Sequence, residues 1–483
     1  MKISYIIIIA LILLTLFSCR ESEEFTDDPS ALLAFSTDTV QFDTVFTTIG
    51  STTLQFRFYN PNNKAVKTTI ALAGGSSSYY RLNIDGQPAT EIKDYEILAN
   101  DSAYVFVEVT IDPRNSNNPM VIDDSVMFYT NGNNQNVKLV AYGQDVHLYN
   151  DEYVEIPTWV ADKPYLIYNN VAIKEDATLT IEAGARIHFH NESAMWVVGT
   201  LNVMGTAEKP VTFQGDRLEE WYENAPGQWY GILHVDDKMY RTGGIHFFAK
   251  SKNNIIDHAI IKNGIRGVQV DSLGEGTQPK LILSNSIIKT MGEIGLVAQS
   301  SNMLVFNTVI ANCGYYAVML NLGGHYEFYH STIGNYYKFS SRKTESLAFN
   351  NYYEPDDGIK AFDFSSVFGN CIIYGDQKNE FITEFNTSTG AQVGFLFDHC
   401  LMKLEDDFDT SNEDIYKNII RHEGSLPNFV NTHEGNFRLD TLSAAKDQGS
   451  TYYSSFYPKD QDGVDRILDG KPDLGAYERV EGE

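Results

Sequence analysis

The chain has 483 residues, 43% of them hydrophobic and 13% aromatic, and 36 Lys and Arg against 64 Asp and Glu give a formal net charge of −28. A charge of this size and sign excludes a broad basic face for nucleic acid or anionic lipid. The apolar content excludes a disordered acidic tail, and four cysteines are too few for a disulfide scaffold. We expect a large, acidic, aromatic-rich β protein of roughly three domains, at about 150 residues per domain.

The N-terminus has the pattern of a secretion signal. Lys2 precedes an apolar run over residues 5–17, which is too short to cross a bilayer of about 30 Å as a helix. The run ends in LFSC at residues 16–19, which resembles the lipobox of bacterial lipoproteins. The resemblance implies a signal peptide over residues 1–18 and membrane attachment through a lipidated Cys19. The alternative is an ordinary secretory peptide with a cysteine at this place.

An acidic tether is expected over residues 19–33. The segment RESEE at 20–24 is followed by Asp27 and Asp28. Acidic residues at this place are similar to the signal with which some Gram-negative lipoproteins reach the outer face of the outer membrane. The resemblance implies a lipid-anchored, cell-surface-exposed protein. A periplasm-facing anchor is the alternative location, and a solvated, flexible tether would use the same residues.

Residues 34–146 alternate apolar and polar residues between turn clusters. Short strands at about ten-residue spacing predict an antiparallel sandwich. The period-2 runs lie at 53–58, 66–72 and 104–111, and the turn signals lie at 60–63, 84–86 and 131–133. The segment is similar to the immunoglobulin-like spacer domains of bacterial surface proteins, although it contains no cysteine. A linker is expected over residues 147–168.

A repeat runs through residues 169–436. Each copy has Asn or His, then a small residue, then a bulky and mostly aliphatic pair. The copies begin at His258, Asn285, Asn307, His330, Asn370 and His399. Five residues after the first four of these stand Asn263, Thr290, Asn312 and Asn335, which predict a stacked polar ladder at a turn.

This repeat resembles the right-handed parallel β-helix family, and an antiparallel barrel would need neither the ladder nor the register. The expected fold class is therefore all-β, with the sandwich followed by a right-handed parallel β-helix. Cys371 and Cys400 share the small-residue position. They are expected as buried thiols, and a disulfide between them is the alternative.

The last segment, 437–483, is expected to cap the open end of the β-helix, where unpaired strand edge needs cover. Its DQDGVDR at 460–466 and PDLGAYE at 472–478 resemble the C-terminal segment of many bacterial surface β-helix proteins. Asp460, Asp462 and Asp465 alternate around a glycine as carboxylates do in Ca²⁺ loops. The alternative is a turn in which Asp side chains accept backbone N–H groups. No other cofactor is expected.

Right-handed β-helices include polysaccharide lyases, hydrolases and non-catalytic adhesins, so the fold alone does not assign a function. The acidic pairs at 236–237, 356–357 and 406–407 lack the motif surroundings of the polygalacturonase family. The candidate bases and charge neutralisers for lyase chemistry form no family motif; they are Lys262, Arg266, Lys289, His325, Arg342 and Lys343. The net charge also weighs against a polyuronate substrate, unless metal ions or a local basic cleft offset the repulsion.

Two aromatic clusters give the best binding hypothesis, because exposed rings can lie flat against sugar faces. The candidate ligand contacts are Trp221, Tyr222, Tyr337, Arg342, Lys343, Tyr352 and Tyr353. We expect a lipid-anchored surface protein that binds polysaccharide or another extracellular polymer without catalysis and without nucleic acid. The alternatives are a β-helix polysaccharide lyase or glycoside hydrolase, and a structural surface stalk.

Overall fold

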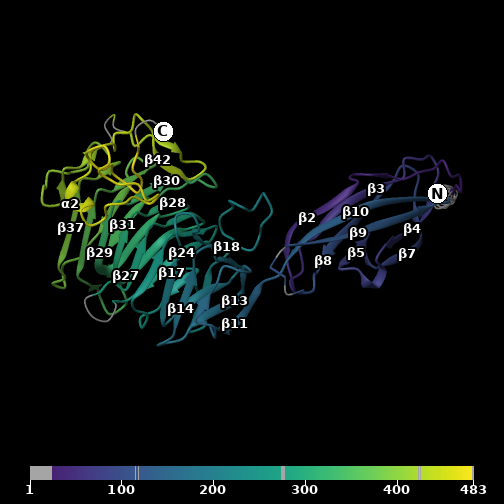
Figure 1. The fold of residues 1–483 in the computed structure, drawn as a ribbon, viewed down its shortest axis with the longest axis horizontal. Coiled ribbons are helices and arrows are strands. Elements are labelled where there is room, and N and C mark those ends of the chain that lie inside the picture. The colour runs from purple at the N-terminus through teal and green to yellow at the C-terminus, as the bar shows by residue number, and fades with distance from the viewer. Residues whose placement is uncertain are drawn as a thin grey trace, which may run out of the picture. The chain divides into compact units, whose positions relative to one another are not determined.

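A computed structural model describes residues 24–114, 116–117, 119–273, 278–421, 424 and 426–480. The expected signal peptide and Cys19 lie outside these residues. The described chain is all-β, and its helices are the short α2 (Thr451–Ser454) and a 3-10 turn at Gly75–Ser77. No helix in the described ranges has both the length and the apolarity to cross a membrane. The chain divides into two compact units, residues 1–145 and 146–483 (Figure 1).

The first unit contains two five-stranded sheets, ordered β1-β3-β8-β5-β6 and β2-β10-β9-β4-β7. Their strands are β1 (Ala34–Phe35), β2 (Thr39–Phe46), β3 (Leu54–Tyr59), β4 (Val66–Leu72), β5 (Tyr80–Ile84), β6 (Gln87–Pro88), β7 (Glu91–Ile97), β8 (Ser102–Val109), β9 (Met120–Thr130) and β10 (Asn133–Gln144). Neighbouring strands pair antiparallel, except that β2 and β10 run parallel. Alternate residues of both sheets, such as Phe56 and Val126, share one apolar core. The period-2 pattern predicted this alternation.

The second unit is built on a 26-stranded parallel sheet. Its strands are β11 (His147–Tyr153), β12 (Thr158–Trp159), β13 (Tyr165–Ile173), β14 (Thr178–Glu182), β15 (Arg186–Phe189), β16 (Ala194–Val197), β17 (Thr200–Met204), β18 (Val211–Gly215), β21 (Ile245–Phe247), β22 (Asn254–Asp257), β23 (Ala259–Lys262), β24 (Arg266–Asp271), β25 (Leu281–Ser284), β26 (Ile287–Met291), β27 (Ile294–Phe306), β28 (Val309–Cys313), β29 (Val318–Tyr329), β30 (Thr332–Asn335), β31 (Leu347–Asn350), β34 (Phe364–Gly369), β35 (Ile372–Gly375), β36 (Phe381–Glu384), β37 (Val393–Asp398), β38 (Leu401–Met402), β39 (Tyr416–Lys417) and β40 (Ile420–Arg421). Each strand pairs with its counterpart in the next repeat, as β23 does with β26 and β26 with β28.

The expected linker over 147–168 is wrong. Strand β11 and the start of β13 pair in parallel within the large sheet, and β12 pairs with β14. Trp159 is fully buried, and its ring stacks on Tyr165 with the centroids 4.3 Å apart. The parallel unit therefore begins directly after Asp145. Its first strands do not carry the repeat motif, so the sequence pattern did not reveal them.

The repeat positions have distinct structural roles. The leading residues share a left-handed backbone with φ between 46° and 55°; they are His258, Asn285, Asn307, His330, Asn370 and His399. Asn and His tolerate this conformation better than most residues with a Cβ. In each bulky pair the second residue enters the large core, as Ile288 and Ile310 do. The first residue faces outward.

The small residues are buried, and their hydroxyl or thiol groups bond to the backbone two residues back. Ser286 Oγ donates to the Ser284 carbonyl at 2.6 Å, and Cys371 Sγ donates to the Gly369 carbonyl at 3.4 Å. Cys371 and Cys400 are free buried thiols, as expected, and are not joined. The amide ladder occurs at the leading positions, where Asn307 Nδ2 donates to Asn285 Oδ1 at 2.9 Å.

The C-terminal segment covers the flank of the parallel sheet, whereas we expected a cap over its end. The outward residues of β26, β28, β35 and β38 form two apolar clusters with this segment, and Figure 1 shows it beside β28 and β30. The segment contributes to these clusters Phe437, Leu439, Leu474, Ala476 and Tyr477. The segment packs here because the first residue of each bulky pair faces outward. Without the segment, the flank would expose a stripe of aliphatic side chains.

A buried charge cluster fixes this segment. Arg466 is fully buried, and its Nη2 donates to Asn307 Oδ1 at 2.9 Å and to the Ala476 carbonyl at 3.1 Å. Its Nη1 lies 3.5 Å from Glu478 Oε2. Asp473 lies beside Glu478, because the Asp473 N–H donates to both carboxylate oxygens of Glu478 at 3.1 Å. Burial raises the pKa of Glu478 to about 9 and that of Asp473 to about 6.

We expect the stability of the docked segment to fall as the pH rises between about 7 and 9. Since the folded pKa of Glu478 lies above its unfolded value, the folded state holds a proton in this window that the unfolded state has lost. The effect reaches at most about 1.4 kcal/mol per pH unit. Burial lowers the pKa of His330, which contacts the segment through Ser454, so this imidazole stays neutral throughout the window.

Calorimetric melting of the full chain across this window checks the expectation. Glu478→Gln keeps the shape of the side chain but cannot ionise, so its melting temperature should change little. If the wild-type chain melts at the same temperature at both ends of the window, the assignment of a buried protonated carboxyl is wrong.

Candidate functional site

Two adjoining cavities of about 160 and 390 Å³ lie on the flank of the parallel sheet, beside the C-terminal segment. Both are bounded by Lys289 in the middle of β26 and by Glu434 and Gly435. The last two residues belong to the turn of a hairpin formed by β41 (Phe429–Asn431) and β42 (Asn436–Leu439). We call this double hollow the flank cleft. It lies where this hairpin meets the flank of the parallel strands.

The floor of the cleft carries two stacked lysines. Lys262 ends β23, and the parallel register places it directly opposite Lys289 on β26. Lys262 keeps 13% of its side-chain surface exposed, and its Nζ reaches the Glu223 carbonyl at 3.3 Å and the Glu223 carboxylate at 3.9 Å. Burial lowers the pKa of Lys262. Two like charges on neighbouring strands repel each other.

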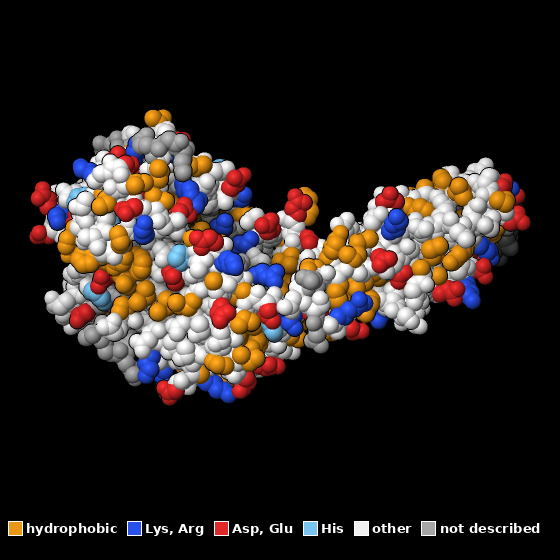
Figure 2. Space-filling model, viewed as in Figure 1, with side chains coloured by type: hydrophobic (Ala, Val, Ile, Leu, Met, Phe, Trp, Pro, Cys, Tyr) orange, Lys and Arg blue, Asp and Glu red, His pale blue; other side chains and the backbone are white. Residues whose placement is uncertain are grey.

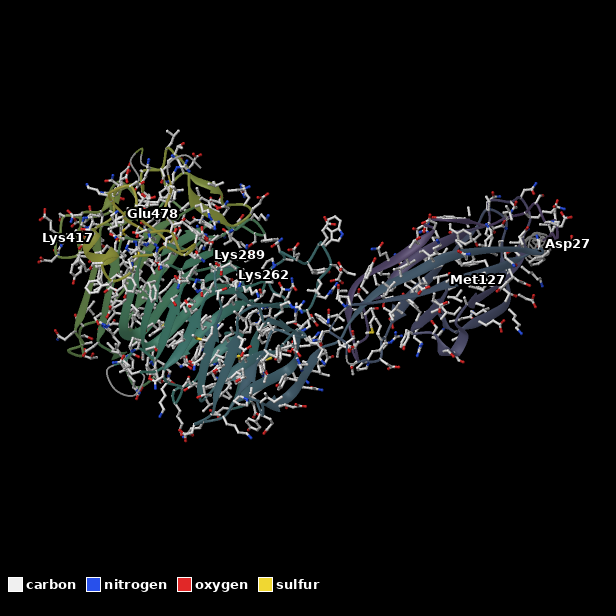
Figure 3. The ribbon with its side chains drawn as sticks, in the orientation of Figure 1. Asp27, Met127, Lys262, Lys289, Lys417 and Glu478 are labelled. Atoms are coloured by element: carbon white, nitrogen blue, oxygen red, sulfur yellow. The ribbon has the colours of Figure 1, made fainter. Side chains whose placement is uncertain are left out.

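Lys289 makes no side-chain hydrogen bond or ion pair with any residue that the structure describes. Its ammonium lies against the hairpin turn, where a Cβ added to Gly435 would be 3.3 Å from Nζ. Burial and the charge of Lys262 lower the pKa of Lys289, and the Glu223 carboxylate opposes this shift. Figure 3 labels both lysines beside each other, and Figure 2 shows Lys and Arg side chains gathered in the same region of the surface.

The remaining walls combine amide, aromatic and basic groups. Asn312 Nδ2 donates to the Thr432 carbonyl at 3.1 Å, so the hairpin is fixed over the cleft. Tyr336 packs against Phe429 and Phe437 of the hairpin strands, with both centroid distances 6.2 Å. The smaller cavity is also lined by Lys338, Phe339, Asn224, His433 and Thr290. The residues lining the larger one include Arg438, Asp462, Gln461 and His258. A ligand in the cleft can therefore meet hydrogen-bonding amides, the apolar ring of Phe339 and positively charged side chains.

The sequence did not single out this cleft. The sequence indicates Lys262 and Lys289 only as separate candidates, although each stands four residues after the leading residue of its repeat. This common offset was the available signal. The walls come from segments as far apart in the chain as Thr206 and Tyr477, and no local sequence pattern predicts that they meet.

The aromatic residues predicted as ligand contacts line neither cavity. Trp221 is 90% exposed, and Arg217 lies over the ring of Tyr222 at 3.9 Å. Trp221 and Tyr222 belong to the insertion after β18, which also supplies Glu223 and Asn224 to the cleft region. Trp221 thus stays available to a ligand beside the cleft.

The second predicted cluster is divided between two places. Tyr352 and Tyr353 form β32, which pairs with β33 (Lys360–Ala361) in a hairpin after β31. Tyr353 is 43% exposed and its ring stacks with Phe362 at 6.2 Å. Tyr337 packs against Phe339 at 5.6 Å, next to the cleft. Lys343 is exposed and lines neither cavity.

Arg342 is buried, so its predicted ligand contact is wrong. Its Nη2 and Nη1 donate to the two carboxylate oxygens of Glu380 at 2.7 and 2.9 Å. Ser346 Oγ and the Gln377 N–H also donate to Glu380. The side chains of Arg342 and Glu380 are 2% and 0% exposed, and a ligand cannot reach either group.

The predicted Ca²⁺ loop has the structure of its alternative, a backbone-capping turn. Asp460 accepts the N–H groups of Asp462, Val464 and Glu478 at 2.7–2.9 Å. Asp462 pairs with Arg438 at 2.7 Å. In the described part of the chain, no three His, Cys, Asp or Glu side chains are grouped as metal ligands would be.

A second polar cluster lies on the outer face of β29 and β34. His325 Nδ1 is 2.7 Å from Ser365 Oγ, and its Nε2 is 3.1 Å from Glu327 Oε1. This is the order of nucleophile, base and orienting acid. Strand β34 is paired along its length with β29 and β37, so the sheet occupies the backbone around Ser365. An oxyanion would find no backbone donors there. We therefore favour the flank cleft as the site.

No family model matches the chain, and no curated protein matches it in sequence. Solved structures with a weak likeness include a family 123 glycoside hydrolase from Clostridium perfringens, with 10% identity and a TM-score of 0.18. That match covers 24% of this chain and only 26% of the hydrolase. The PapD-like domain of human CEP192 matches at 9% identity over 26% of this chain and 96% of its own, with a TM-score of 0.18. The Agl-KA catalytic domain matches at 10% identity over 72% of this chain and 80% of its own, with a TM-score of 0.22. At TM-scores this low, none of them assigns a function.

Proposed function

We propose that the protein is a lipid-anchored surface protein that binds an extracellular polysaccharide in the flank cleft, without catalysis. The proposal includes an immunoglobulin-like spacer, a right-handed parallel β-helix and anchoring to the outer membrane through Cys19. The alternating strands of the first unit and the in-register parallel strands of the second support these two folds. The lipobox-like LFSC at residues 16–19 supports the anchor.

The observation that carries the binding role is the flank cleft. Its two adjoining hollows extend along the sheet flank, as a site for several units of a chain-like ligand requires. The Asn224 amide can bond sugar hydroxyls, and the exposed ring of Phe339 lies in the wall of the smaller hollow. Trp221, which is 90% exposed, belongs to the same insertion as Asn224. A purely structural stalk would need neither the hollows nor these exposed groups.

Binding of the purified full-length chain to an array of extracellular glycans tests this function. We expect retention of one class of polysaccharide, and no consumption of it during prolonged incubation. Release of shorter or unsaturated fragments would replace binding by hydrolysis or elimination. Binding to no glycan on the array would favour the structural stalk.

A further inference from the structure

We propose that the flank cleft selects polysaccharides with anionic groups, and that Lys262 and Lys289 bind a carboxylate or sulfate of the sugar. This inference rests on the proposed polysaccharide-binding function and specifies the ligand class of the same site. The first observation is the register, which stacks the two lysines on neighbouring strands.

The second observation is that Lys289 lacks a counter-ion. It borders both hollows and has no hydrogen-bond or ion-pair partner among the described residues. In a chain with 64 acidic and 36 basic residues, an acidic partner for a lysine is easy to supply. Lys262 has one carboxylate partner, Glu223 at 3.9 Å, and Lys289 has none in the described part of the chain, so the two lysines form a local excess of positive charge.

The third observation is the partial burial of both ammonium groups. Burial lowers the pKa of each lysine, since desolvation disfavours the charged form. An anion placed between them would reverse this cost, because it restores the lost solvation by charge-assisted hydrogen bonds. The other groups facing Lys289 are Lys338, His433 and Glu434 around the smaller hollow, and His258, Arg438 and Asp462 around the larger one.

The acidic surface elsewhere gives this site its selectivity. At a net charge of −28 the chain repels polyanions in general, so an acidic polymer is attracted only where basic groups outnumber acids. The flank cleft meets that condition on its floor. A neutral polysaccharide would gain nothing from the two lysines and would leave their repulsion unrelieved.

Binding of the full-length chain to alginate, dextran sulfate and neutral dextran, measured by calorimetric titration, tests the inference. We expect binding to at least one of the two polyanions and weaker or no binding to dextran. Binding to alginate alone assigns a carboxylate, and binding to dextran sulfate alone assigns a sulfate. Added salt should weaken the binding, because it screens the charges.

Lys262→Gln and Lys289→Gln should each reduce affinity for the polyanion by about tenfold, as expected for a charge-assisted contact. Lys378→Gln is the matched control, since it removes one exposed charge that lines neither hollow. The Lys289→Gln chain should melt no lower than wild type, which separates lost binding from misfolding. Equal binding to dextran and polyanions, unchanged by both substitutions, would overturn the inference and keep the proposed function. If the wild-type chain binds no glycan at all, both the inference and the proposed function are wrong.

Discussion

Replacing Arg342 by methionine should lower the free energy of unfolding by about 3–5 kcal/mol. The substitution leaves the Glu380 carboxylate fully buried without its bidentate cation. The two remaining donors, from Ser346 and Gln377, cannot neutralise the charge. The ion pair joins the segment after β30 to the turn before β36. The lost stability should appear as a lower denaturant midpoint.

Arg342→Met/Glu380→Leu is the control, since it removes both charges together. This double variant should recover most of the lost stability, because an apolar pair of similar volume is often as stable as a buried ion pair. A single variant with unchanged stability but lost glycan binding would contradict the structural role. It would restore Arg342 as a ligand contact.

Replacing Arg466 by methionine should release the C-terminal segment, at a cost of about 3–5 kcal/mol to its docking. Three carboxyl groups, of Asp460, Asp473 and Glu478, surround this fully buried guanidinium. The apolar core inside the parallel sheet is a separate cluster, so the loss should be local. Limited proteolysis should cleave the variant between about residue 437 and the C-terminus, while the strands of the parallel sheet stay intact.

Arg438→Met is the matched control for this prediction. Arg438 pairs with Asp462 at 2.7 Å, but its side chain is 47% exposed, so its removal should cost less than about 1 kcal/mol. An Arg466→Met chain as resistant to protease as wild type would show that the segment is held by its apolar contacts alone. Release of the segment should also weaken glycan binding, because the β41–β42 hairpin bounds the flank cleft.

The sequence predicted most of the strand pattern but misassigned its edges. The copies beginning at Asn285, Asn307 and His330 are regular, so their register could be read directly, and the structure pairs them in parallel. The strands before Asn169 lack this motif, so the sequence pattern predicts a linker there. The sequence predicts the C-terminal segment at the end of the β-helix. Its true position on the flank depends on which residue of each bulky pair faces outward, and the repeat pattern alone does not show this.

The candidate site was harder to predict for a similar reason. Arg342 and Glu380 are 38 residues apart, and only the folded chain shows that they form a buried pair. Exposed rings such as Trp221 were correctly expected outside the core. The repeat offset predicts that the two lysines stack. Nothing in the sequence near Lys289 predicts that a hairpin close to the end of the chain lies beside them.

The most direct measurement is a crystal structure of the full-length chain with an oligosaccharide of the polyanion that it binds. We expect an anionic group of the sugar in the flank cleft, with an oxygen about 2.7–2.9 Å from Lys289 Nζ. Further sugar units should follow the larger hollow toward Asn285. An oligosaccharide bound on the β32–β33 hairpin, with the flank cleft free of sugar, would contradict the account.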